Sequence, residues 1–189
     1  MPVIGRIGKK MRATLLRLRF GRGFSQLAQE RAVRAAIEAA GLDCVRGLQL
    51  LDAVLGDTRG EPFDFGRDSV HWLVFACLAD SLPAVSRILE IGTYDGQFTA
   101  ILARLFPAAE ITTVDLPETD PILRSTYQRD ADAAYRRFVA TRDANLAAPN
   151  IRFRQFNSAF LLDHVAGPFD LVWVDGGHLY PEVAWDLAA

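Results

Sequence analysis

The sequence predicts an α/β fold, a doubly wound parallel sheet preceded by N-terminal helices. From residue 87 onward, short apolar runs typical of buried strands alternate with segments of helical periodicity. This alternating order gives a parallel sheet with right-handed crossovers and helices on both faces. Residues 24–86 instead show helical spacing of their apolar positions. We therefore expect a basic arm (1–23), a helical region (24–86) and an α/β domain (87–189).

Composition excludes several classes of protein. Of the 189 residues, 50% are apolar and 23% are charged, the balance of a soluble globular protein rather than a disordered chain. No apolar run approaches the roughly 20 residues that a membrane span needs. The two cysteines, Cys44 and Cys77, are far apart, which argues against a disulfide scaffold or a cysteine zinc site. We expect a cytoplasmic protein with reduced thiols.

The charge is unevenly distributed. Residues 1–36 hold nine bases and one acid, whereas the remainder holds 12 bases and 22 acids. An acidic body does not attract nucleic acid through a general field. The excess of bases in the arm is typical of a helix with a solvated basic face, or of a segment that contacts a membrane surface or a partner. The sequence leaves the oligomeric state open.

Two helices are expected after the arm. Ser25 can cap the first, and Gly41 stands at the left-handed position that commonly ends a helix. Asp43 can cap the second helix, and Gly56 is expected to end it.

A loop and a third helix follow. Residues 57–67 contain the glycine, proline and charge typical of a loop. Asp68 or Ser69 can cap the third helix, which Pro83 should terminate. This helix is apolar nearly all round, so we expect it to be buried against a sheet.

The α/β part contains four segments with the length and pattern of strands, of which the third alternates and the other three are apolar runs. Helical periodicity separates them, and a helix begins after the last. The expected strands cover 87–92, 111–116, 151–156 and 169–176, and the expected helices cover 97–106 and 130–147 and begin at 181.

Polar residues follow all four strands, at the edge where doubly wound sheets bind their ligands. The first strand ends at Glu90 and leads into a turn in which Gly92 and Gly96 allow a close backbone approach. Asp115 ends the second strand about twenty residues later, where a carboxylate can accept both hydroxyls of a ribose.

The other two strand ends carry further candidates. Asn157 and Ser158 follow the third strand and suit an adenine edge, and Asp175-Gly176-Gly177-His178 follows the fourth. Each feature alone is also compatible with an ordinary turn. Four polar strand ends in one array favour a nucleotide-like ligand.

The segments LEIGTYDGQFTAILA, TVDLPE and FDLVWVDGGHLYPEVAWDL resemble a class I S-adenosylmethionine-dependent methyltransferase, a Rossmann-like fold. DGGHLYPEV is similar to the DG-x-H-x-Y element of the small-molecule O-methyltransferase branch. The resemblance covers about residues 87–187. Tyr94 stands where the family's E/D-x-G-x-G-x-G pattern usually has its middle glycine. The NAD-type GxGxxG is absent.

The resemblance implies roles for the matching positions. The turn after the first strand would enclose the methionine part of S-adenosylmethionine, Asp115 would bind the ribose, and Leu116 would lie against the adenine. Asn157 or Ser158 would lie near the adenine amine. Asp175 would face the methyl-transfer centre or bind a divalent metal such as Mg²⁺, and His178 would be the general base. The turn residues concerned are Glu90, Gly92, Thr93, Tyr94 and Gly96.

The resemblance also sets expectations for the whole protein. The family's sheet has seven strands and this sequence ends just after the fourth, so we expect a truncated copy or a fragment of a longer reading frame. The expected function is S-adenosylmethionine-dependent methylation of a hydroxyl on a small molecule such as a sugar, polyketide or phenol. The alternatives are a non-catalytic nucleotide-binding or interaction module that uses the basic arm and, less favoured, a dehydrogenase.

Overall fold

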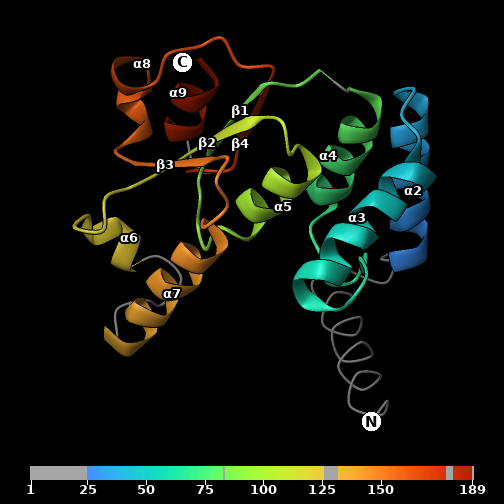
Figure 1. Ribbon diagram of the computed structural model, residues 1–189, viewed down its shortest axis with the longest axis horizontal. Helices are drawn as coiled ribbons and strands as arrows, with labels where there is room; N and C mark the ends of the chain where they lie inside the picture. The colour runs from blue at the N-terminus through green and yellow to red at the C-terminus, as the bar shows by residue number, and fades with distance from the viewer. Residues whose placement is uncertain (1–24, 83, 126–131, 178–180, 189) are drawn as a thin grey trace. The chain divides into compact units, whose positions relative to one another are not determined.

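A computed structural model describes residues 25–82, 84–125, 132–177 and 181–188. The chain divides into two compact units, residues 1–82 and 83–189, which are described separately (Figure 1). The predicted basic arm lies outside the described residues. Within the part that is described, no helix is both long and apolar enough to cross a membrane.

The described residues of the first unit form three helices, α2 (Gln26–Ala39), α3 (Cys44–Arg59) and α4 (Val70–Ser81). The predicted caps of the first two are confirmed. The Ser25 hydroxyl accepts a hydrogen bond from the Ala28 amide at 3.3 Å. The Asp43 carboxylate accepts bonds from the Val45 and Arg46 amides at 2.9 and 3.0 Å. These bonds satisfy amides that the helix itself leaves unpaired.

The predicted end of α3 at Gly56 is wrong. The helix continues to Arg59, and Gly60, with φ 70°, provides the left-handed ending. A single glycine inside a helix costs only about 1 kcal/mol relative to alanine. Gly56 therefore does not interrupt the helix, and the predicted loop begins three residues later than expected.

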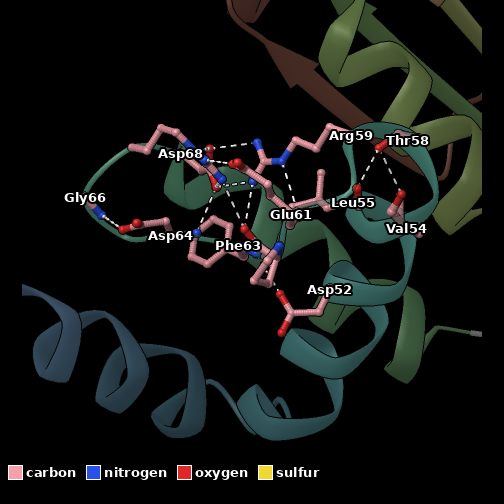
Figure 2. A network of polar contacts seen from close by, with 12 residues as sticks. Asp52, Val54, Leu55, Thr58, Arg59, Glu61, Phe63, Asp64, Gly66 and Asp68 are labelled. Atoms are coloured by element: carbon pink, nitrogen blue, oxygen red, sulfur yellow. Dashed lines mark hydrogen bonds and ion pairs between the residues drawn. The ribbon is translucent and has the colours of Figure 1, made fainter. Parts of the chain in front are cut away.

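The predicted capping of α4 is confirmed in its position but not in its hydrogen bond. Ser69 occupies the cap position, but within the described residues its side chain makes no capping hydrogen bond. The Asp68 carboxylate binds Arg59, Arg67 and the Asp64 amide instead (Figure 2). Two guanidinium partners are stronger than a capping amide. Residue 83, the predicted terminator, lies outside the described residues.

Helices α3 and α4 approach closely at Gly47. A Cβ atom at this position would lie 2.3 Å from the Cys77 Sγ and 2.9 Å from the Cys77 Cα. Cys44 and Cys77 are both buried and free. The expectation that α4 packs against a sheet stays a prediction.

In the part of the second unit that the structure describes, there are four parallel strands, β1 (Arg87–Ile91), β2 (Glu110–Asp115), β3 (Ile151–Gln155) and β4 (Leu171–Val174), in the order β3-β2-β1-β4. This confirms the predicted parallel sheet. The chain builds outward from β1 through β2 to β3 and then crosses to the other side of β1. The order therefore reverses between β1 and β4.

Helices cover both faces of this sheet, as predicted. Helix α5 (Gln97–Leu105) contacts α7 (Asp132–Asn145), whereas α9 (Glu182–Ala188) contacts β4 and the 3₁₀ turn η2 (Ser158–Phe160). Figure 1 shows α8 (Leu161–His164) and α9 on one side of the sheet and α5 and α7 on the other.

Two of the connections contain short helices that the sequence analysis did not predict. Helix α6 (Pro121–Ser125) follows β2, and η2 and α8 join β3 to β4. Apolar side chains from β1, β2 and α8 form one core cluster, made of Leu89, Ile91, Val114 and Leu161.

Candidate functional site

The candidate site lies at the carboxyl ends of the strands, where the strand order reverses between β1 and β4. At such a point the loops leaving two adjacent strands turn to opposite faces of the sheet and leave room for a ligand between them. The loops that leave β1, β2 and β4 carry most of the residues singled out from the sequence.

Gly92 allows the loops after β1 and β4 to meet. Its φ is 102°, and its amide donates to the Val114 carbonyl at 2.8 Å. A Cβ atom here would lie 2.3 Å from the carbonyl oxygen of Asp175. A residue with a side chain could not occupy this position without displacing backbone.

Gly96 ends the same turn and begins α5. It has φ 73° and is buried, and a Cβ atom on it would lie 3.1 Å from Leu146. The Asn145 side chain at the end of α7 donates to the Asp95 carbonyl at 2.8 Å. Helix α7 therefore packs against the turn, a contact that the sequence did not predict.

Asp115 and the turn come together as the sequence predicts. One carboxylate oxygen, Oδ2, accepts a hydrogen bond from the Tyr94 amide at 2.8 Å, and Oδ1 accepts one from the Leu116 amide at 2.8 Å. The residue is half-buried. The two amides therefore fix the orientation of the carboxylate at the edge of the sheet.

Glu90 is buried inside the unit, with 1% of its surface exposed. Its Oε2 accepts hydrogen bonds from the hydroxyls of Thr99 and Thr113 at 2.5 and 2.6 Å, and Thr113 also shares one with Thr93 at 2.6 Å. Burial raises the pKa of Glu90 to about 7, despite the opposing effect of the two hydroxyl donors. Glu90 and Thr93 therefore support the turn from within.

The remaining predicted site residues follow β3 and β4. The Asn157 side chain accepts from the Ala159 amide at 2.9 Å and so begins η2, and Ser158 is the first residue of η2. Asp175 is exposed after β4, and its amide donates to the Ile91 carbonyl at 2.8 Å. The position of His178 lies outside the described residues.

Asp186 is a residue of this region that the sequence analysis missed. It belongs to α9 and is 6% exposed. Its Oδ2 lies 3.0 Å from the point that a Cβ atom on Gly176 would occupy. Its position as an acid within the apolar segment EVAWDLA was the one sequence feature that could have indicated a buried carboxylate.

The described residues contain no group of three or more His, Cys, Asp or Glu side chains arranged to hold a metal ion. A metal-binding role for Asp175 stays a prediction.

The family was identified by comparison with family models. A model described as a methyltransferase domain matches residues 89–189, more than half of the chain. The chain belongs to this methyltransferase family. The predicted resemblance to a methyltransferase is confirmed, and the matched range begins within β1 and includes β2, β3 and β4.

Solved structures provide more distant likenesses. The chain is 19% identical to the SAH-bound methyltransferase PaMTH1 of Podospora anserina (TM-score 0.42), with 81% of this chain and 59% of that chain covered. It is 20% identical to the O-methyltransferase TomG of Streptomyces achromogenes, solved with SAM and involved in tomaymycin synthesis (TM-score 0.43; 85% and 68% covered). An O-methyltransferase family protein of Burkholderia thailandensis is 17% identical (TM-score 0.30; 55% and 28% covered). No curated protein matches the chain significantly.

Proposed function

We propose that the chain binds S-adenosylmethionine as part of a methyltransferase that acts on a hydroxyl of a small molecule such as a sugar, polyketide or phenol. The family membership supports methyl transfer. The observation that carries the cofactor assignment is Asp115, whose carboxylate is fixed by two backbone amides beside the glycine turn.

The residues at the strand ends fit this cofactor. The Asp115 carboxylate is suited to accept the two ribose hydroxyls, with Leu116 against the adenine and Asn157 or Ser158 near its amine. Gly92 and Gly96 permit backbone to approach the methionine part closely. Glu90, Thr93 and Tyr94 complete this wall, Glu90 and Thr93 as buried supports.

The proposed reaction assigns roles to two residues after β4. The cofactor, when bound, supplies a methyl group on a positively charged sulfur. The acceptor hydroxyl must lose its proton as its oxygen bonds to the methyl carbon and the carbon–sulfur electron pair returns to sulfur. We assign His178 as the base that takes this proton, from its place in the sequence three residues beyond Asp175. Asp175 would face the acceptor or, alternatively, hold a divalent metal that orients the hydroxyl.

We also infer a cytoplasmic location. Free, buried Cys44 and Cys77 are in keeping with a reducing compartment.

Calorimetry with S-adenosylhomocysteine tests the cofactor assignment. Loss of a hydrogen-bonded acceptor costs about 1–3 kcal/mol, so Asp115→Ala should weaken binding by about 5- to 150-fold. Asp120→Ala, in the same loop, serves as the control and should bind normally. Unchanged affinity in Asp115→Ala would refute the assignment, and binding of NADH in preference would favour the dehydrogenase alternative.

Turnover tests the base. General-base catalysis typically contributes 10²–10⁴-fold, so His178→Ala in the active protein should lower kcat by about this factor and leave cofactor affinity unchanged. A variant that keeps most of its activity would favour Asp175. Cofactor binding without methylation of any of the three acceptor classes would favour the non-catalytic alternative.

A further inference from the structure

Tyr94 has an unusual backbone conformation for a residue with a side chain. Its φ is 51°, in the left-handed region, and it is the only non-glycine residue with a positive φ in the described part of the chain. A side chain in this region is disfavoured, and such strain persists only where the surroundings impose it. This is the position where the family pattern usually has glycine, so the sequence departure and the backbone strain coincide.

The left-handed conformation has a direct consequence for the candidate site. It accompanies the 2.8 Å hydrogen bond from the Tyr94 amide to Oδ2 of Asp115. The other oxygen is held by the Leu116 amide, the neighbour of Asp115 in sequence. The Tyr94 amide therefore links the carboxylate directly to the glycine turn.

Helix α7 contacts the Tyr94 side chain. The ring of Tyr94 lies 5.7 Å, centre to centre, from that of Phe138, which lies 6.4 Å from that of Tyr135. The Tyr135 hydroxyl donates a hydrogen bond to the Glu118 carbonyl at 3.1 Å. Glu118 lies three residues after Asp115 in the sequence. The contacts therefore run from Asp115 through Tyr94, Phe138 and Tyr135 to Glu118, in the loop that follows Asp115.

The buried guanidinium of Arg142 also connects α7 to the loop after β2. Arg142 of α7 is 3% exposed, and its guanidinium donates to the Glu118 carboxylate at 2.6 Å and lies 4.9 Å from the centre of the Phe153 ring. The position of α7 is thereby set by β3 and by the loop after β2. The Tyr94 ring therefore packs against a helix whose position is fixed.

We propose that Phe138 and the Tyr94 ring are positioning residues that direct the Asp115 carboxylate toward the cofactor ribose. Phe138 holds the ring, the ring holds the left-handed backbone, and the backbone amide orients the carboxylate. The inference about the ribose rests on the proposed function, whereas the link from Phe138 to Asp115 is a property of the chain alone. The two parts are tested separately.

Amide hydrogen exchange measured by NMR tests the link without any ligand. In Phe138→Ala the Tyr94 amide should exchange at least tenfold faster. The Gly92 amide, bonded to the Val114 carbonyl in the same turn, should not change. Phe138→Tyr keeps a ring and should restore slow exchange, and Val139→Ala controls for general weakening of α7. Unchanged exchange at Tyr94, or equal acceleration at Gly92, would overturn the proposal.

Binding tests the consequence for the ribose. The affinities for S-adenosylhomocysteine and for its 2′-deoxyribose analogue are compared in the native protein and in Phe138→Ala. A misdirected carboxylate should lower the preference for the 2′-hydroxyl, and Asp115→Ala should abolish it. Equal loss for both ligands would mean that Phe138 is merely structural. If the native protein binds neither ligand, the proposed function fails, while the exchange experiment still decides the link.

Discussion

Glu90 combines burial with hydroxyl partners rather than a cation. Within the described residues its carboxyl group accepts hydrogen bonds from two threonine hydroxyls, and the negative charges of Asp175 and Asp115 also raise its pKa. A buried carboxyl without a cationic partner favours its neutral form. The group under the glycine turn is therefore poised between its two protonation states near neutral pH.

This predicts a pH dependence of stability. The folded-state pKa of about 7 lies above the usual 4.5, so the folded state binds the proton more tightly than the unfolded chain. The resulting stability is complete below pH 4.5 and is lost as the pH rises through about 7, by an amount on the order of 3 kcal/mol. Urea unfolding at pH 5–8 should show this decline in the native protein and a flatter profile in Glu90→Gln. Glu110→Gln, at an exposed site, should keep the native slope, and parallel profiles for native protein and Glu90→Gln would contradict the prediction.

Gly92 provides a second test of the turn. In Gly92→Ala the new Cβ would meet backbone of Asp175, and the alanine would have a φ of 102°. We expect a loss of about 2–4 kcal/mol in the stability of the second unit, measured by hydrogen exchange of its strands. Gly56→Ala provides the contrast, because a Cβ there meets nothing within 4 Å in the described structure and should stabilise α3 by about 0.5–1 kcal/mol. Native-like exchange in Gly92→Ala would show that the two loops can separate at little cost.

The loop between α3 and α4 is organised by one carboxylate. Asp68, whose side chain is 3% exposed, accepts bonds from Arg59 at 2.9 and 2.5 Å and from Arg67 at 3.0 Å (Figure 2). Burial opposes its ionisation, but the hydrogen bonds from the two arginines outweigh this effect and hold its pKa below the usual range. The Asp52 carboxylate fastens the loop to α3 by accepting the Phe63 amide at 2.7 Å.

Removing the charge at Asp68 should loosen this loop. Asp68→Asn leaves two guanidinium groups without their carboxylate, and we expect a loss of about 1–3 kcal/mol in the stability of the first unit. Asp57→Asn, exposed on the same helix, should have little effect. Because the native pKa is lowered, the contribution of Asp68 is lost as the pH falls through that value, and the difference between native protein and Asp68→Asn should shrink in acid. Equal stability of native protein and Asp68→Asn at pH 7 would mean that the other contacts of the loop hold it in place.

The sequence predicted regular elements better than the contacts between them. Apolar runs identified β1, β2 and β4, because buried parallel strands are apolar on both faces, and alternating apolar residues identified β3. The caps at Ser25 and Asp43 were predictable because they depend on neighbours in sequence. Gly56 misled because a glycine inside a helix resembles one at its end until φ is known.

The candidate site was predictable where it depends on strand ends. Asp115 and the glycine turn meet because parallel strands bring their carboxyl ends to one edge of the sheet. The support from Phe138, Asn145 and Asp186 was not predictable, since it depends on how α7 and α9 pack against the sheet. Short segments such as η2 and α8 were missed because they carry too few residues for a periodic signal.

The molecule as a whole places every residue of the proposed cofactor site in the second unit. Glu90 to Gly96, Asp115, Asn157, Ser158 and Asp175 all lie between residues 83 and 189, and the core cluster of that unit lies directly within β1, β2 and α8. The first unit has buried residues of its own on all three helices. We therefore expect ligand binding to stabilise one unit selectively.

Hydrogen exchange with and without S-adenosylhomocysteine measures this selectivity. A ligand that binds only the folded state stabilises it by RT ln(1 + [L]/Kd), about 2.7 kcal/mol at a concentration of 100 Kd. At that concentration the amides of β1 and β2 should exchange roughly 100-fold more slowly where exchange requires unfolding of the second unit. Those of α2 and α3 should change little. In Asp115→Ala at the same ligand concentration, the slowing of β1 and β2 should decrease by about the factor by which the affinity decreases. Equal slowing in both units would mean that they unfold together as one cooperative body, and slowing confined to α2–α4 would place the ligand in the first unit.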